Sequence, residues 1–302
     1  MPEIYAVTAT TLNLRASPLI NPGNIIGRLG QGELVQKIGQ PSLDWFQVTN
    51  AHGGGFAAAR FLERVNAELP PPPAPAAAQF IPPQVNFLPK PQSRLDSTEQ
   101  RHCPLNGIPI RPRLQGMTDA ERCQDLHAVV QLLDVGNSAR YLPTSTSTFC
   151  NIYAYDVCYL SGVYLPRVWW MSKALLDISR GLEPGVVYGK TVGELTANAL
   201  FDWLTEWGDE FGWRQCASVD ELQAAANQGS LGVICAQRKE RSRSGHIVTV
   251  LPETPAHPAD RRGPMLLPVQ SQAGASNKQY FTNQWWIDRG FQFRAVGFWT
   301  HP

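Results

Sequence analysis

The chain has 302 residues, 43% of them hydrophobic, which is enough for a sizeable core and indicates two domains, or one domain with an attached module. Its 26 basic and 25 acidic side chains nearly cancel, so no overall field favours nucleic acid as a partner. No run of about 18 apolar residues predicts a membrane span, and the first residues lack the basic and apolar regions of a secretory signal. We therefore expect a globular protein that stays in the cytoplasm as made, with neither nucleic acid nor membrane as partner.

The six cysteines are too sparse for a disulfide scaffold, and none form the C-x-x-C pairs that zinc sites favour. Cys150 and Cys158, if they share one helix, would lie about 12 Å apart along its axis, beyond disulfide reach. We expect free thiols, no metal and no other cofactor.

Residues 1–65 contain short alternating segments such as TLNLRAS, ELVQKIG and WFQVT, separated by Gly, Asp and Pro-Gly, which is typical of a small all-β barrel. An L-N-x-R start, a G-x-L-x-x-G middle, a W-x-x-V strand and a final G-F strand resemble the bacterial SH3 family. The matching residues are Leu12, Asn13, Arg15, Pro18, Gly27, Leu29, Gly32, Trp45, Val48, Gly55 and Phe56. The resemblance implies a module that targets cell-wall peptides or, as the alternative, a spacer or lid packed on the rest of the chain.

Residues 66–102 are rich in proline and include ELPPPPAPAAAQFIPPQ. Such a stretch favours extended polyproline conformation over a helix or a central strand. We interpret it as a linker between domains; a ligand for another protein's SH3 domain is the alternative.

Residues 103–302 carry an α+β pattern. Apolar periodicity and caps predict helices at 118–133, 150–160, 193–212 and 218–229. Runs rich in β-branched and aromatic residues then predict strands at 231–237, 245–252, 265–274 and 293–299. Helices followed by an antiparallel sheet predict an α+β domain.

A nucleophile is predicted at Cys150, where the polar run STSTF gives way to an apolar, helix-like segment. A helix N-terminus carries partial positive charge and unpaired N–H groups, so a thiol there ionises more easily than one in an apolar interior. His246 opens a predicted strand and can supply the base that a thiol nucleophile needs. On the next strand, Gln270 and Gln272 lie two residues apart and so share a face.

This order of cysteine, histidine and polar side chain resembles the papain-like superfamily. F-C-N-x-Y around Cys150, G-H-I-V-x-V around His246 and V-Q-S-Q-A-G around Gln270 resemble its peptidoglycan-cleaving members, the NlpC-type and CHAP amidases and peptidases, and amidase toxins of the same fold. The likeness spans roughly residues 118–302. It departs from NlpC-type enzymes, which usually read D-C-S-G at the nucleophile, and from CHAP enzymes, which often carry Glu and Asn at the two glutamine positions.

The resemblance implies a papain-like catalytic domain in which Cys150 attacks a peptide carbonyl, His246 takes the thiol proton and Gln270 orients the imidazole. Four further residues are candidates for the substrate groove: Asn151, Tyr141, Gln272 and Trp170. A structural turn is the alternative role for Tyr141, and core packing is the alternative for Trp170.

The predicted function is a peptidoglycan hydrolase that cleaves amide bonds of the stem peptide. The alternatives are a non-catalytic wall-binding protein and a cytosolic cysteine peptidase or transamidase acting on proteins. Peptidoglycan or muropeptides are the expected partners, with an immunity protein if the chain is a toxin. Without a signal, such a hydrolase would be exported by a dedicated secretion system as an antibacterial effector, released by lysis as a lysin, or confined to recycling imported fragments.

The proline-rich stretch predicts two separately folding pieces with a protease-sensitive connection. Limited proteolysis of the full chain, followed by mass spectrometry, should yield fragments of about 65 and about 200 residues. Cleavage first inside either piece, with the 66–102 stretch intact, would mean that the stretch is docked.

Overall fold

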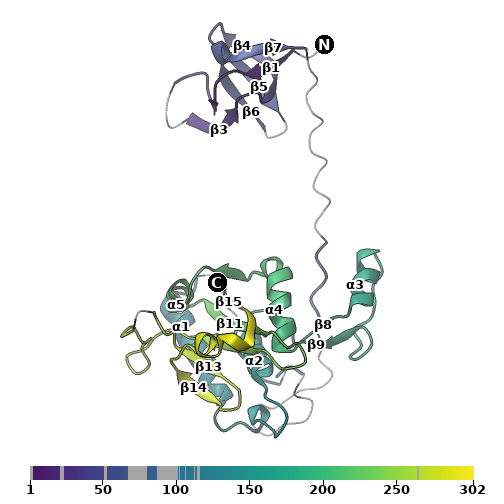
Figure 1. Cartoon of the computed structure of the whole chain (residues 1–302), viewed down its shortest axis with the longest axis vertical. Helices are drawn as coiled ribbons and strands as arrows, with labels where there is room; N and C mark the ends of the chain where they lie inside the picture. The colour runs from purple at the N-terminus through teal and green to yellow at the C-terminus, as the bar shows by residue number, and fades with distance from the viewer. Residues whose placement is uncertain are drawn as a thin grey trace. The chain divides into compact units, whose positions relative to one another are not determined.

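The computed structural model describes residues 3–20, 24–50, 53–66, 80–86, 101, 103–105, 107–111, 113, 116–263 and 265–302. The chain divides into two compact units, Met1–Phe80 and Ile81–Pro302 (Figure 1). The division falls within the stretch predicted as a linker, and residues 67–79 and 87–100 of that stretch lie outside the described residues. The limits of the predicted domains stay a prediction.

The first unit is an antiparallel sheet of seven strands, with the order β3-β2-β6-β5-β4-β1-β7. Its strands are β1 (Glu3–Val7), β2 (Thr11–Arg15), β3 (Ile25–Gly30), β4 (Leu34–Ser42), β5 (Trp45–Asn50), β6 (Gly53–Ala58) and β7 (Leu62–Val65), with the 3-10 turn η2 (Ala59–Phe61) before β7. The all-β character agrees with the prediction. Barrel closure does not, because the edge strands β3 and β7 do not pair with each other among the described residues.

A small apolar core holds this sheet together, and its buried members are Val7, Leu12, Leu29, Val35, Val48 and Ala57. Gly55, one of the residues that match the SH3 pattern, has no room for a side chain. A Cβ there would lie 2.8 Å from Leu14 Cγ and 2.9 Å from the Arg15 carbonyl. The SH3 resemblance of the unit stays a prediction.

The second unit is mixed α/β, built on a six-stranded antiparallel sheet with the order β10-β15-β11-β12-β13-β14. The strands are β10 (Arg214–Cys216), β11 (Leu231–Arg238), β12 (His246–Val250), β13 (Gln270–Gln272), β14 (Lys278–Phe281) and β15 (Phe293–His301). In the central pair, Ala236 lies opposite His246 and Gly232 lies opposite Val250. The strands predicted at 231–237, 245–252 and 293–299 are confirmed, whereas the strand predicted at 265–274 is limited to β13, and β10 and β14 were not predicted.

Both faces of this sheet are covered, because its strands alternate apolar side chains to opposite sides. Val233 and Cys235 of β11 and Ile247 of β12 belong to the core formed with α2 (Cys150–Leu160) and α4 (Ala197–Glu206). Their neighbours on the opposite face pack in a second core with α5 (Val219–Asn227) and α6 (Trp285–Asp288); these are Ile234, Ala236, Val248 and Val250. In Figure 1, α4 lies beside β11.

The predicted helices are confirmed, with the third shortened to α4 followed by the 3-10 turn η4 (Gly208–Phe211). Helix α1 (Asp119–Leu133) begins with a capping box between Thr118 and Glu121. The sequence did not predict α6, the 3-10 turns η3 (Ala139–Tyr141) and η5 (Gly290–Gln292), or an arm made of β8 (Val168–Trp170), α3 (Ser172–Ser179) and β9 (Val192–Glu194). No described helix is long and apolar enough to cross a bilayer.

Part of the stretch predicted as a linker packs onto the second unit. The Val85 N–H donates to the Tyr164 hydroxyl at 2.9 Å, and the Trp170 indole N–H donates to the Pro83 carbonyl at 2.8 Å. Val85 is buried in the main core. Residues 81–86 therefore extend the second unit on its N-terminal side.

A buried ion pair joins α2 to the segment before it. Arg140 Nε donates to Asp156 Oδ2 at 2.6 Å, and Nη2 donates to Asp156 Oδ1 at 3.0 Å and to the Cys103 carbonyl at 2.7 Å. The Tyr141 hydroxyl donates to the same carboxylate at 2.8 Å. Because Arg140 and Asp156 are fully buried, neither charge can be satisfied by water if the other is lost.

Replacing Arg140 by Met should lower the free energy of unfolding by about 3–5 kcal/mol, because it leaves a buried carboxylate without its cation. The matched control is Lys173→Met, which removes an exposed pair with Asp177 and should change stability by at most about 0.5 kcal/mol. Urea unfolding followed by tryptophan fluorescence measures both. Equal midpoints for the two variants would contradict this account of the pair.

Candidate active site

Cys150 is the first residue of α2, as predicted, and only 3% of it is exposed. Phe149 at the N-cap makes no side-chain capping bond, so no side chain competes for the N–H groups at the start of the helix. Those N–H groups and the helix dipole favour negative charge at this position. The local structure therefore suits a thiolate.

The thiol is hydrogen-bonded to the imidazole of His246, the first residue of β12, and to the backbone N–H groups of Ile247 and Asn151. Burial disfavours the thiolate, but the bond to His246, its charge and the two N–H groups outweigh burial, so the pKa of the Cys150 thiol lies below its usual value. Packing of α2 against β12 makes this contact between residues almost a hundred positions apart in sequence.

His246 is held on its other side by Gln272, whose Oε1 lies 2.8 Å from His246 Nε2. Because an amide oxygen only accepts, Nε2 carries the proton and Nδ1 is left to face the thiol. Burial disfavours the imidazolium, but the contacts with Cys150 and Gln272 outweigh it and raise the pKa of His246. The raised pKa of His246 and the lowered pKa of Cys150 both favour a thiolate–imidazolium pair.

Gln270 does not orient His246, contrary to the expectation. Its Nε2 donates to the Asn283 carbonyl at 2.9 Å, and its Oε1 accepts from the Trp285 indole at 2.9 Å. The two glutamines do lie on one face, but Gln270 pairs with Val250, the last residue of β12, whereas Gln272 is nearer the opposite end of β12, which begins with His246. The orienting contact is therefore made by Gln272, which was expected to bind substrate.

Trp285 was not predicted as part of the site. Its ring packs edge-on against the His246 imidazole, with 4.7 Å between centroids, and only 8% of it is exposed. Gln270 fixes the indole through the hydrogen bond described above. Gln270 thus affects His246 only indirectly, through the Trp285 ring that packs against the imidazole.

The other expected groove residues are engaged elsewhere. Tyr141 is fully buried and bonded to Asp156, which is the structural role left open for it. The Asn151 amide donates to the Leu195 carbonyl at 2.9 Å, and the Trp170 indole is bonded to Pro83. None of the three lines the pocket beside His246.

That pocket, here called the His246 pocket, has a volume of about 320 Å³. His246 and Gln272 form one part of its wall, and Thr148, two residues before the nucleophile, forms another. The remaining lining is Arg238, Ser244, Gly245, Gly274, Ala275, Ser276, Lys278, Asn283, Trp285, Arg289 and Phe293. A peptide group in this pocket would lie against the imidazole.

The other thiols are unlike Cys150. None of the six cysteines forms a disulfide bond, in agreement with the spacing argument. Burial raises the pKa of Cys123, Cys158, Cys216 and Cys235. Among the described residues no cluster of three or more His, Cys, Asp or Glu side chains could hold a metal.

No protein-family model matches the sequence, and no curated protein matches it. Among solved structures, the chain is similar to NlpC2 from Trichomonas vaginalis, at 9% identity, with 94% of this chain and 96% of that chain covered. The TM-score of that superposition is 0.22, which is too low to establish a shared fold or activity.

We expect iodoacetamide to alkylate Cys150 faster than the other five thiols at neutral pH, because its thiolate is formed at lower pH. Gln272→Ala removes the acceptor that stabilises the imidazolium, so the pH at which Cys150 becomes reactive should rise by about one unit. Gln270→Ala is the matched control, because it leaves the bond between His246 and Gln272 in place. It should shift the pH at which Cys150 becomes reactive by less. The measurement is peptide-resolved mass spectrometry across pH; the ionisation it reports belongs to the Cys–His pair.

A fast-reacting thiol other than Cys150 would contradict this electrostatic account. So would a larger shift for Gln270→Ala than for Gln272→Ala.

Proposed function

We propose that the second unit is a cysteine hydrolase that cleaves amide bonds in peptidoglycan stem peptides. The single observation that carries the proposal is the hydrogen-bonded series of Cys150, His246 and Gln272 beside the His246 pocket. A thiol, a base and a group that orients the base form the minimal machinery of thiol acyl transfer. The choice of peptidoglycan rests on the motifs around Cys150 and His246.

In the proposed reaction, His246 Nδ1 holds the proton released by Cys150, and the thiolate attacks the carbonyl carbon of the scissile amide. The carbonyl oxygen becomes an oxyanion, which the Cys150 N–H at the uncapped start of α2 is placed to stabilise. His246 then donates its proton to the departing amine, and a thioester remains on Cys150. Water, deprotonated by His246, releases the acyl group and restores the thiol.

Gln272 has a positioning role in this scheme. It keeps the imidazole in the tautomer that faces the thiol, and it accepts a hydrogen bond from the imidazolium. A neutral amide stabilises the imidazolium less than a carboxylate does, so the thiolate itself supplies the rest.

Incubation with purified sacculi, followed by analysis of released muropeptides, tests the proposal and identifies the bond that is cut. Cys150→Ala and His246→Ala should each lower turnover by roughly 10³-fold or more, and the double variant should lose little beyond either single one, because the two groups act as a unit. Cys123→Ser, which alters a thiol bonded to carbonyls in the last turn of α5, is the control and should retain activity.

Undiminished release by Cys150→Ala would rule out the thiol mechanism. Loss of activity in Cys123→Ser to the same degree would point to a general effect on folding.

A further inference from the structure

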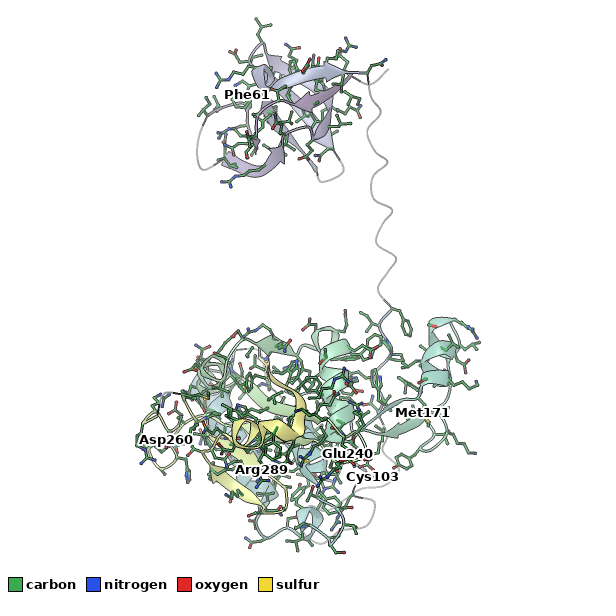
Figure 2. The ribbon with its side chains drawn as sticks, viewed as in Figure 1. Phe61, Cys103, Met171, Glu240, Asp260 and Arg289 are labelled. Carbon is green, nitrogen blue, oxygen red and sulfur yellow. The ribbon has the colours of Figure 1, made fainter. Side chains whose placement is uncertain are left out.

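The His246 pocket is lined by three cationic side chains and by no carboxylate. The three come from separate elements: Arg238 ends β11, Lys278 begins β14 and Arg289 follows α6. Arg289 is exposed and is labelled beside the C-terminal part of the second unit in Figure 2. Positive charge thus reaches the pocket from several directions.

Arg238 is fixed in place rather than free to swing into solvent. Its Nε donates to the Ser244 carbonyl at 2.9 Å, its Nη1 donates to Gln292, and its guanidinium lies 4.9 Å from the centre of the Phe293 ring. Within the described part of the chain its Nη2 has no hydrogen-bond partner. A pre-positioned donor of this kind loses little entropy when it binds an anion.

The cations of the pocket lack the counter-charges found elsewhere on this unit. Among the described residues, Arg238, Lys278 and Arg289 form no ion pair, whereas Arg241 is paired with Asp202 and Arg261 with Glu253. Burial and the nearby charges of Arg243 and Arg289 lower the pKa of Arg238. Like charges gathered around a cavity without compensation are unfavourable unless an anion joins them.

We propose that the His246 pocket binds a substrate carboxylate, carried by the peptide residue next to the scissile amide. The identity of that peptide rests on the proposed function. Arg238 Nη2 would donate directly to the carboxylate, with Lys278 and Arg289 adding charge around it. Since the pocket includes His246 and Gln272, an anchored carboxylate would hold the adjoining amide against the imidazole.

The test compares two forms of one probe: soluble stem peptides released from sacculi, and the same peptides with every carboxylate converted to a primary amide. Wild-type protein should cleave the acid form with kcat/KM about tenfold or more above that for the amidated form. Arg238→Gln should lose about the same factor on the acid form and little on the amidated form. Arg289→Gln should show the same pattern with a smaller loss, because its side chain is exposed.

Arg241→Gln is the matched control, since Arg241 lies in the same hairpin loop but its side chain is paired with Asp202 and does not line the pocket. It should cleave both forms as wild type does. Equal loss in Arg241→Gln would show a general effect of loop charge and would overturn the assignment. If Arg238→Gln lost activity on intact sacculi alone, the three cations would bind an anionic wall polymer. That result would also overturn the assignment of a carboxylate pocket.

A binding measurement separates this inference from the proposed function. Calorimetric titration of Cys150→Ala with the two peptide forms should show tighter binding of the acid form. If wild type cleaves neither form while Cys150→Ala still prefers the acid, the hydrolase proposal fails and the carboxylate pocket stands. If wild type cleaves both forms equally, the pocket assignment fails and the hydrolase stands. Absence of both cleavage and preference overturns both.

Discussion

The site depends on the loop that joins β11 to β12, where Asn198 of α4 meets Gly245. Asn198 Oδ1 accepts from the Arg238 N–H at 2.9 Å, and Nδ2 donates to the Arg243 carbonyl at 2.8 Å. A Cβ on Gly245 would lie 2.6 Å from Asn198 Oδ1 and 2.5 Å from the Ala236 carbonyl, so only glycine allows this approach. One contact thus sets both the end of β11, which carries Arg238, and the start of β12, which carries His246.

From that loop the remaining geometry follows through packing. Apolar side chains of β12 bury against α2, and this brings the uncapped start of α2 over the strand end where His246 lies. Tyr153 of α2 reinforces the same contact further along, because its hydroxyl lies 2.6 Å from Ser271 Oγ on β13. The reactive thiol is therefore held by a helix and a sheet, which fix a side chain more firmly than a loop does.

The sequence predicts the parts of this site that local signals determine. The polar-to-apolar change places Cys150 at a helix start, and the strand pattern places His246 at a strand start; both placements agree with the structure. Local signals cannot decide which of Gln270 and Gln272 contacts His246. The alternation of side chains along a strand predicts that both glutamines lie on one face, but the pairing between strands determines which of them reaches the histidine. The interior position of Tyr141 likewise depends on Arg140 and Asp156, which meet only after folding.

The same distinction applies to the fold. Short alternating segments identify the strands of the first unit, but whether the edge strands β3 and β7 pair is a long-range property that no segment contains. Residues 81–86 carry the proline pattern of a linker, yet carbonyl and N–H groups of that stretch bond to Trp170 and Tyr164. Proline-rich composition excludes helix and central strand without excluding docking in extended form.

The proposed carboxylate pocket also bears on the chemistry of the imidazole. The charge of Arg238 lowers the pKa of His246, in opposition to Cys150 and Gln272, which raise it. A carboxylate bound to Arg238 would offset that charge and so favour the imidazolium, the form that protonates the departing amine. Substrate binding and proton donation would then be coupled through one guanidinium, which touches the pocket and lies close enough to act on His246 through space.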